Sequence, residues 1–81
     1  MTFKDQTIVV TGAAGNLGAV VAAAFHQAGA RVVLVDAMQG FLDHRFPDAD
    51  PRYVKLAVDL LDREAVAASF ADIQSQYGGI D

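Results

Sequence analysis

The 81-residue sequence contains no cysteine and no tryptophan, and only two of its residues are proline. Without cysteine the chain can form no disulfide, no thiolate metal site and no cysteine nucleophile. Basic residues are also few, because six Lys and Arg stand against ten Asp and Glu, for a formal net charge of −4. This balance argues against electrostatic attraction to nucleic acid or to anionic lipid, so we expect neither partner.

Long apolar runs are missing as well. Charged residues or glycines interrupt every apolar segment before it reaches the roughly 20 residues that cross a bilayer. The amino end, Met1-Thr2-Phe3-Lys4-Asp5, lacks the apolar core of a secretory signal, so we expect a cytoplasmic protein with no membrane partner. The content of 53% hydrophobic residues is instead typical of one compact domain.

The most informative segment is a glycine-rich turn between a predicted strand, Thr7 to Thr11, and a helix predicted from about Asn16 to Ala28. A strand that continues through such a turn into a helix presents unpaired N–H groups and the positive end of the helix dipole to an anion. The alternative is an ordinary turn that binds nothing. We predict a phosphate site formed by Gly12, Gly15, Asn16, Leu17 and Gly18.

A second strand is predicted from Arg31 to Asp36, and Asp36 lies eighteen residues beyond Gly18. This is close to the distance at which dinucleotide-binding folds place the carboxylate that binds the ribose hydroxyls. The alternative for Asp36 is a solvated acid at a strand end. The strand, the turn, the helix and the spaced acid together favour a dinucleotide site.

The remaining pattern repeats the alternation of strand and helix. We predict a weaker helix from Met38 to Phe46, a strand from Tyr53 to Val58, and a third helix capped by Asp62 and stopped by Gly78. Apolar strands alternating with helices predict an α/β fold, a Rossmann-like doubly wound parallel sheet in strand order 3-2-1. Ile80-Asp81 resembles the start of a fourth strand. Residues 1–81 are thus expected to be the amino-terminal part of a single NAD-binding domain, truncated after three strand-helix units.

Apolar faces and polar residues of the helices lead to further expectations. We expect Gly18 and Ala22 to bring the first helix close to the sheet, and His26 to lie on its solvated side. Asp43, Asp48 and Asp50 are expected to be solvated, and no metal site is predicted. The expected apolar stripes are Leu17, Val20, Val21, Ala24, Phe25 and Ala28 in the first helix, and Val66, Phe70, Ile73 and Tyr77 in the third.

These motifs together resemble the amino-terminal half of a short-chain dehydrogenase/reductase. The resemblance rests on Thr11-Gly12, the turn to Gly18, Asp36, the Asp59-Leu60 pair and Tyr77-Gly78-Gly79-Ile80-Asp81. It implies that Asp59 and Leu60 contact the adenine ring of the cofactor. It also implies an oxidoreductase that transfers hydride between a nicotinamide cofactor and an alcohol or carbonyl substrate. The chain departs from the family pattern by having Asn16 at the usual middle glycine, with Gly15 one place earlier.

The resemblance bears on the choice between NAD and NADP. Members that use NADP usually carry a basic residue in the glycine turn or just after the second strand, where this chain has Ala13, Ala14 and Ala37. Asp36 can accept hydrogen bonds from both ribose hydroxyls and would repel a phosphate placed there. The sequence therefore predicts NAD, with no counter-charge for a second phosphate.

The resemblance also indicates which catalytic residues to seek: a tyrosine with a lysine four residues later, an upstream serine and an asparagine. Ala57 stands four residues after Tyr53, and Asp81 four after Tyr77, so no catalytic residue is assigned. We expect the 81-residue chain alone to be inactive. Two functions remain open: the NAD-binding half of an oxidoreductase, or a non-catalytic nucleotide-sensing or interaction module of Rossmann type.

The predicted strand order leaves the first strand at an edge of the sheet. Exposed strand edges have unpaired backbone groups that recruit partners, so we expect self-association and a homo-oligomer. The apolar face of the third helix is expected to be poorly covered.

Overall fold

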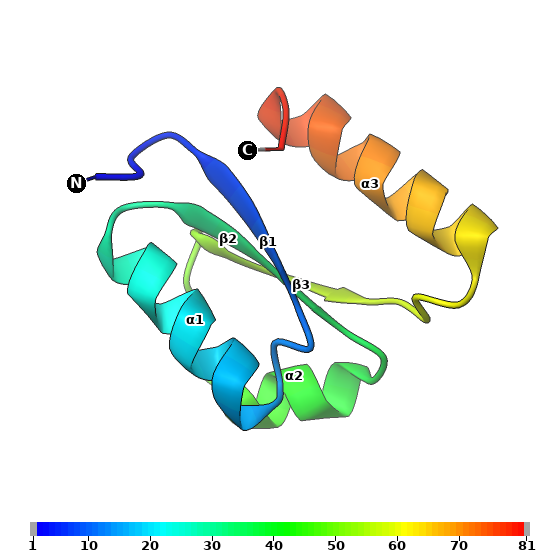
Figure 1. The fold of residues 1–81 in the computed structure, drawn as a ribbon, viewed down its shortest axis with the longest axis horizontal. Coiled ribbons are helices and arrows are strands. Elements are labelled where there is room, and N and C mark those ends of the chain that lie inside the picture. The colour runs from blue at the N-terminus through cyan, green and yellow to red at the C-terminus, as the bar shows by residue number, and fades with distance from the viewer. Residues whose placement is uncertain (1, 81) are drawn as a thin grey trace.

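A computed structural model of the chain describes residues 2–80, in which strands and helices alternate strictly (Figure 1). The predicted elements are confirmed to within one residue at each end. A fourth strand was expected to start at Ile80-Asp81; Ile80 lies in no strand, and Asp81, like Met1, lies outside the described residues. The elements are β1 (Thr7–Thr11), α1 (Asn16–Gln27), β2 (Arg31–Asp36), α2 (Gln39–Arg45), β3 (Tyr53–Ala57) and α3 (Arg63–Tyr77).

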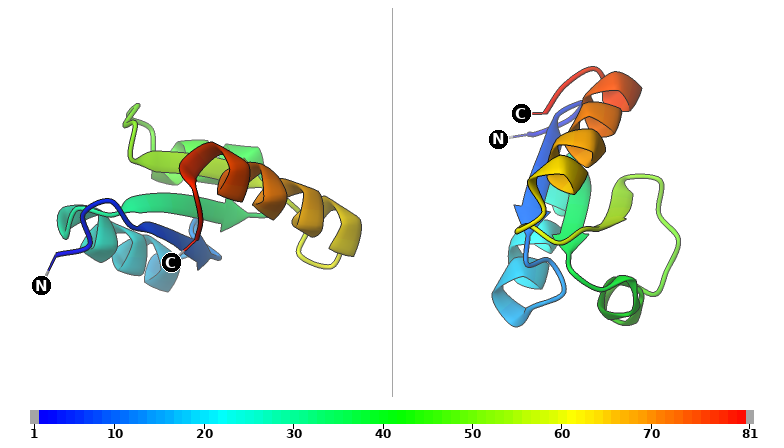
Figure 2. Two further views of the ribbon diagram at one scale, coloured as in Figure 1. Left: turned by 90° about the horizontal axis from the view of Figure 1, so that it is seen from above. Right: turned by 90° about the vertical axis from the view of Figure 1, so that its right-hand side faces the viewer.

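The three strands form a parallel sheet with β2 in the centre, which confirms the predicted strand order. Helices α1 and α2 cover one face of this sheet and α3 covers the other (Figure 2). Because side chains alternate along a strand, Val32 and Leu34 pack toward α1 and α2, whereas Val33 and Val35 pack toward α3. Residues 32–35 are therefore fully buried, as expected for the central strand of a three-layer α/β fold.

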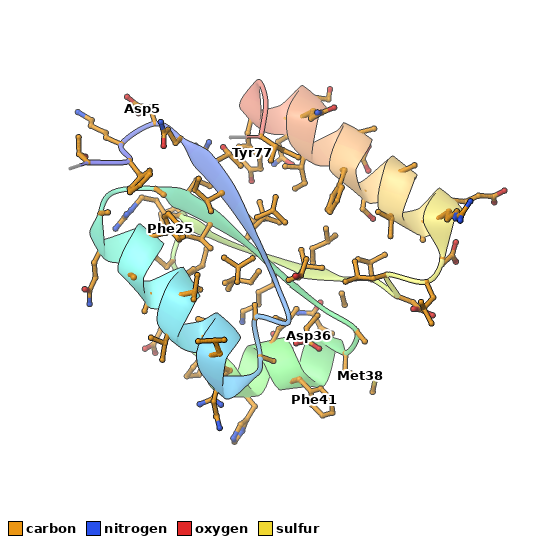
Figure 3. All side chains as sticks on the ribbon, viewed as in Figure 1. Asp5, Phe25, Asp36, Met38, Phe41 and Tyr77 are labelled. Atoms are coloured by element: carbon orange, nitrogen blue, oxygen red, sulfur yellow. The ribbon has the colours of Figure 1, made fainter. Side chains whose placement is uncertain are left out.

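Helix α3 begins and ends as the sequence predicts. The Asp62 side chain accepts a hydrogen bond from the Ala65 backbone N–H at 3.1 Å, and Gly78 adopts the left-handed conformation that ends the helix. Ile73 is only 5% exposed and Tyr77 points toward the sheet, where the Arg31 guanidinium lies 4.1 Å from its ring centroid (Figure 3). The face expected to be poorly covered is covered in part: Ile73 packs against Val33 and Val35 of β2, whereas Val66, Phe70 and Tyr77 stay half-buried.

The apolar stripe predicted for α1 is only partly buried. The fully buried residue of α1 is Ala22, which lies outside the predicted stripe, whereas Leu17 and Val20 of the stripe are 77% and 67% exposed. The small Ala22 side chain packs in the core, whereas Leu17 and Val21 of the stripe lie beside β1, which has no second neighbouring strand among residues 2–80. These side chains and β1 border an open apolar groove of about 320 Å³, the outer groove, lined by Ile8, Val9, Val10, Thr11, Leu17, Gly18, Val21 and Phe25.

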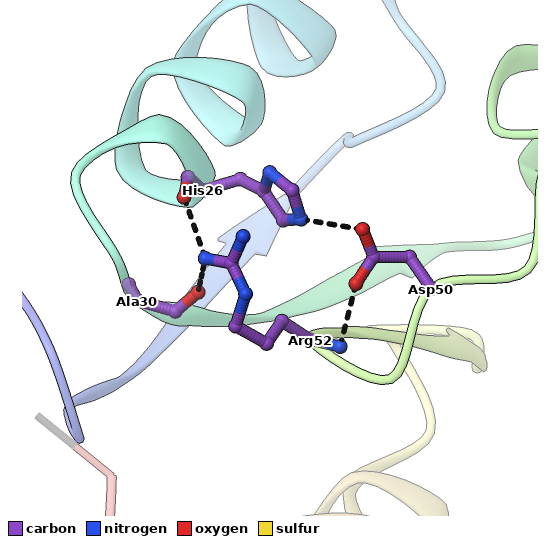
Figure 4. A network of polar contacts seen from close by, with 4 residues as sticks. All are labelled: His26, Ala30, Asp50 and Arg52. Atoms are coloured by element: carbon purple, nitrogen blue, oxygen red, sulfur yellow. Dashed lines mark hydrogen bonds and ion pairs between the residues drawn. The ribbon is translucent and has the colours of Figure 1, made fainter.

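His26 and Asp50 are not solvated as the sequence suggested. The His26 Nε2 atom lies 2.8 Å from the Asp50 carboxylate, and the His26 ring stacks on Tyr53 with centroids 4.1 Å apart (Figure 4). The Arg52 guanidinium donates to the carbonyls of His26 and Ala30 at 2.7 and 3.4 Å. The parallel pairing of β3 with β2 brings the loop before β3 across the carboxyl end of α1, and this produces the network.

Candidate functional site

The predicted site residues meet at the edge where the parallel strands end. Thr11 pairs with Val35, and Asp36 pairs with Ala57, so the three carboxyl ends are adjacent. The glycine turn, Asp36 and the Asp59-Leu60 segment therefore emerge at one edge of the sheet. In open α/β sheets this edge is the usual place for a ligand.

The turn after β1 requires glycine at two positions. Gly12 has φ +65°, a left-handed conformation that glycine adopts without strain, and its carbonyl accepts a hydrogen bond from the Gly15 N–H at 3.0 Å. A side chain at Gly18 would overlap the Gly12 carbonyl and lie 3.1 Å from the Ala13 Cα. Gly18 thus lets the first turn of α1 pack against the glycine turn itself, not against the sheet as the sequence suggested.

The amino end of α1 faces the same edge without a side-chain cap. Gly15 is the N-cap residue in an extended conformation, and no side chain satisfies the first helical N–H groups. These groups belong to Asn16, Leu17 and Gly18, the first three residues of the helix, which have no intrahelical acceptor. They form a cradle with the hydrogen-bonding capacity and the dipole orientation that suit a phosphate group.

Asp36 is fixed against this turn. One carboxylate oxygen accepts a hydrogen bond from the Ala14 N–H at 3.0 Å, and the other accepts one from the Ala37 N–H at 2.8 Å. Each oxygen keeps a further lone pair for a ligand hydroxyl. Asp36 also borders a cavity of about 620 Å³ lined by Ala14, Gly15, Asp36, Phe41, His44 and Arg45, which we call the Asp36 cavity. Figure 3 shows Asp36, Met38 and Phe41 close together after β2.

The other predicted site residues lie outside the Asp36 cavity. Asp59 is exposed, and its carboxylate accepts a hydrogen bond from the Leu61 N–H at 2.9 Å. Leu60 is 49% exposed. The Val58 N–H donates to the Asp36 carbonyl at 3.0 Å, which places this segment beside Asp36 along the sheet edge. Leu17 and Gly18 border the outer groove, so the structure brings Gly15 and Asp36 into one cavity and keeps the others around it.

Sequence reasoning missed Arg45. Its Nε donates to the Ala14 carbonyl at 3.3 Å and its Nη2 donates to the Asn16 side-chain oxygen at 2.6 Å. The sequence predicted no counter-charge for a second phosphate from Ala13, Ala14 or Ala37, and it did not foresee that the end of α2 brings a cation beside the turn. Phe41, His44 and Arg45 were detectable as one helical face from their spacing of three and four residues.

Comparisons with known proteins agree with this geometry. The family model described as short chain dehydrogenase matches residues 6–81. The chain is 33% identical over 98% of its length to cis-4-hydroxycyclohexanecarboxylate dehydrogenase of Sinomonas cyclohexanicum, and 34% identical over its whole length to NAD-dependent glycerol dehydrogenase of Listeria innocua. It spans 32% and 35% of the lengths of these two relatives.

Solved structures give the same result. A short-chain dehydrogenase/reductase from Brucella melitensis matches all of this chain with a TM-score of 0.87 and 30% identity, the match covering 36% of that protein. A metagenomic short-chain oxidoreductase in complex with NADP matches 96% of this chain with a TM-score of 0.84 and 29% identity, covering 37% of that protein. The chain belongs to the short-chain dehydrogenase family, and its Rossmann-like arrangement of three parallel strands is that of the family's solved members.

Two further findings concern residues 2–80 only. In this range no helix has both the length and the apolar character needed to cross a membrane. Nor does this part of the chain gather three or more potential metal ligands of the His, Cys, Asp or Glu type.

Proposed function

We propose that the chain is the NAD-binding part of a cytoplasmic, homo-oligomeric oxidoreductase. The observation that carries this proposal is the Asp36 carboxylate, fixed by two backbone N–H groups beside the glycine turn and open to the Asp36 cavity. Bound there, the nicotinamide cofactor would supply hydride transfer to or from an alcohol or carbonyl substrate. Relatives named as dehydrogenases of glycerol and of a hydroxycyclohexanecarboxylate support that substrate class. We assign no catalytic residue to these 81 residues, and the chain alone should be inactive.

Each part of the cofactor is assigned to residues of this chain. The N–H groups at the turn and at the start of α1 would bind the pyrophosphate, with Gly12, Gly15, Asn16, Leu17 and Gly18 forming the cradle. Asp36 would bind the ribose hydroxyls and favours NAD over NADP, because a phosphate at that place meets its negative charge. Asp59 and Leu60, next along the sheet edge, would border the adenine ring.

Calorimetric titration of the whole protein with AMP, ADP-ribose and NAD tests the proposal. If the residues of this chain bind the adenosine half, all three ligands should bind, and most of the affinity for NAD should already be present with ADP-ribose. A folded sample that shows neither heat nor NMR chemical-shift changes with any of them would contradict nucleotide binding at this site.

The role of Asp36 can be tested by the double substitution Asp36→Ala and Ala37→Arg. It removes the carboxylate and adds a cation, so the ratio of NADP to NAD affinity should increase roughly tenfold to a hundredfold, as expected for a few kcal/mol of reversed electrostatics. Asp48→Ala with Ala49→Arg is the matched control, since it makes the same changes in the exposed loop before β3. An unchanged ratio in the first variant would show that Asp36 does not contact the ribose.

One observation favours the non-catalytic nucleotide-binding module as a second candidate. Ile73 of α3 is only 5% exposed where it packs on β2, so the described residues already place a helix layer on each face of the sheet. A monodisperse monomer of the 81-residue chain that binds AMP would support this alternative.

A further inference from the structure

A cavity at the amino ends of the strands gathers basic residues. It measures about 190 Å³ and lies at the edge of the sheet opposite the glycine turn, since Arg31, which begins β2, lines it. Figure 3 shows Asp5 and Tyr77 at this end of the molecule and Asp36 at the other. Three of the six Lys and Arg residues of an acidic chain border this cavity, against one carboxylate. The lining residues, which define what we call the amino-end cavity, are Lys4, Asp5, Gly29, Arg31 and Arg52.

Contacts within the protein hold Arg52 beside this cavity. Its Nη1 atom donates to the carbonyls of His26 and Ala30 at 2.7 and 3.4 Å (Figure 4). Arg52 thereby places a positive charge at the carboxyl end of α1, where the helix dipole alone would oppose an anion. The Nε and Nη2 N–H groups of Arg52 have no acceptor among residues 2–80, so they remain for a ligand.

Arg31 reaches the same cavity from the face of the sheet that α3 covers. Its guanidinium lies over the Tyr77 ring, 4.1 Å from the ring centroid, and its Nη1 atom donates to the Thr7 hydroxyl at 3.4 Å. These two contacts restrict the side chain, so it loses less entropy on binding an anion than a mobile cation would. Most of its five N–H groups are still available as donors.

The charged groups of the amino-end cavity are not paired with one another. In the part of the chain that the structure describes, the ion pairs are His26 with Asp50 and Lys55 with Asp43, so Asp5 pairs with none of the three cations. Cations held around one cavity repel one another, and a single carboxylate balances only part of their charge. An anion in the cavity would relieve this repulsion.

We propose that the amino-end cavity is a binding site for a phosphate group. Two anchored guanidinium groups supply the planar sets of donors that bind phosphate oxygens, and the exposed Lys4 ammonium supplies a third cation. The volume of about 190 Å³ is below the range of about 300–1,000 Å³ typical of pockets for larger organic ligands, so the site suits a small anion. Because the proposed nucleotide site lies at the carboxyl ends of the strands, the two sites do not overlap.

Inorganic phosphate, titrated into the whole protein at low ionic strength and followed by NMR, tests the proposal. The amide resonances of Gly29 and Arg31 should shift and saturate. The Gly15 amide reports phosphate bound at the glycine turn, so the two sites are measured separately. Glycerol phosphate is the second probe. Equal affinity for it would identify the phosphate group of an ester as the ligand, a clear loss of affinity would identify the free ion, and both results support the site.

Two substitutions of exposed residues should change the phosphate affinity measured at Gly29 in opposite directions. Lys4→Met removes a cation and should weaken binding roughly twofold to fivefold, whereas Asp5→Asn removes the opposing carboxylate and should strengthen it by about the same factor. Asp5 has φ +66°, a conformation that Asn also adopts readily, so the second variant keeps the backbone. The matched controls are Arg63→Met and Asp48→Asn, which remove exposed charges outside the cavity.

Opposite changes in Lys4→Met and Asp5→Asn, with both controls unchanged, would support the site. Two outcomes overturn the inference. If the amides of Gly29 and Arg31 do not respond to phosphate in the folded protein, the cavity binds no such anion. If the controls change the affinity as much as the two variants do, the response reflects the net charge of the protein and not this cavity. In either case nucleotide binding at the glycine turn, which AMP reports, stands or fails independently.

Discussion

β1 and β2 are neighbours in one parallel sheet and are both rich in Val and Ile or Leu, yet they are buried to very different degrees. Residues 32–35 of β2 are fully buried, whereas in β1 Thr7 and Val10 are buried, Ile8 and Val9 are half-buried and Thr11 is exposed. β2 has a strand on each side, while β1 pairs only with β2 among residues 2–80. An apolar run thus favours a strand, but the neighbours that the fold supplies decide how much of it is removed from water.

The most direct test of this contrast makes the same Leu→Ala substitution in the buried strand β2 and in α1 beside the open edge of the sheet. Leu34→Ala in β2 removes a fully buried side chain between α1 and α2 and should lower the free energy of unfolding by about 2–5 kcal/mol. Leu17→Ala in α1 removes a side chain that is 77% exposed and should change it by no more than about 0.5 kcal/mol. Urea denaturation of the whole protein measures both. Similar losses would mean that the outer groove is covered as completely as the core around β2.

The free edge of β1 and the outer groove beside it should also make the 81-residue chain self-associate when it is produced alone. Burying one Leu or Val side chain in such a contact contributes about 1.5–3 kcal/mol, so Leu17→Lys or Val21→Lys, both in the outer groove, should weaken association by at least roughly tenfold in sedimentation experiments. Leu61→Lys is the control, because Leu61 is 92% exposed but does not line the outer groove. A monodisperse monomer with strong amide protection throughout β1 would contradict this prediction.

The same contrast explains which parts of the fold could be predicted from the sequence. Strand and helix positions could, because apolar periodicity, the Asp62 cap and the terminating glycines act locally. The burial of individual residues in α1 could not be predicted. Leu17 and Phe25 belong to one periodic stripe, yet Leu17 is exposed and Phe25 packs against the core, because the two lie differently relative to the edge of the sheet. His26 was misjudged for a similar reason, because its partner Asp50 is 24 residues away in the chain.

The candidate site shows the same limit. The glycine turn and Asp36 form a motif whose spacing is fixed by one strand-helix-strand unit, so the sequence could place them together. Arg45 joins them through contacts to residues 29 and 31 positions earlier, which depend on how α2 packs against the sheet. The sequence could predict a helix there but not the direction in which its last turn would point.

The smallest effect on stability is expected for the polar network of His26, Asp50 and Arg52, which lies near the amino end of β2. The Arg52 backbone N–H donates to the Asp50 carboxylate at 2.8 Å, and together with the His26 contact it holds the pKa of Asp50 below its ordinary value of 3.8. A carboxyl group whose pKa is lowered in the folded state stabilises the fold above its unfolded pKa, and this contribution disappears as the pH falls through the folded value. Asp50→Asn, which keeps an oxygen for the Arg52 N–H but removes the charge, should therefore lower Tm modestly at pH 7 and hardly at all well below pH 3.8. Asp48→Asn, in the exposed part of the same loop, provides the comparison. A deficit in Tm for Asp50→Asn that is the same at both pH values would show that the charge of Asp50 contributes nothing to the network.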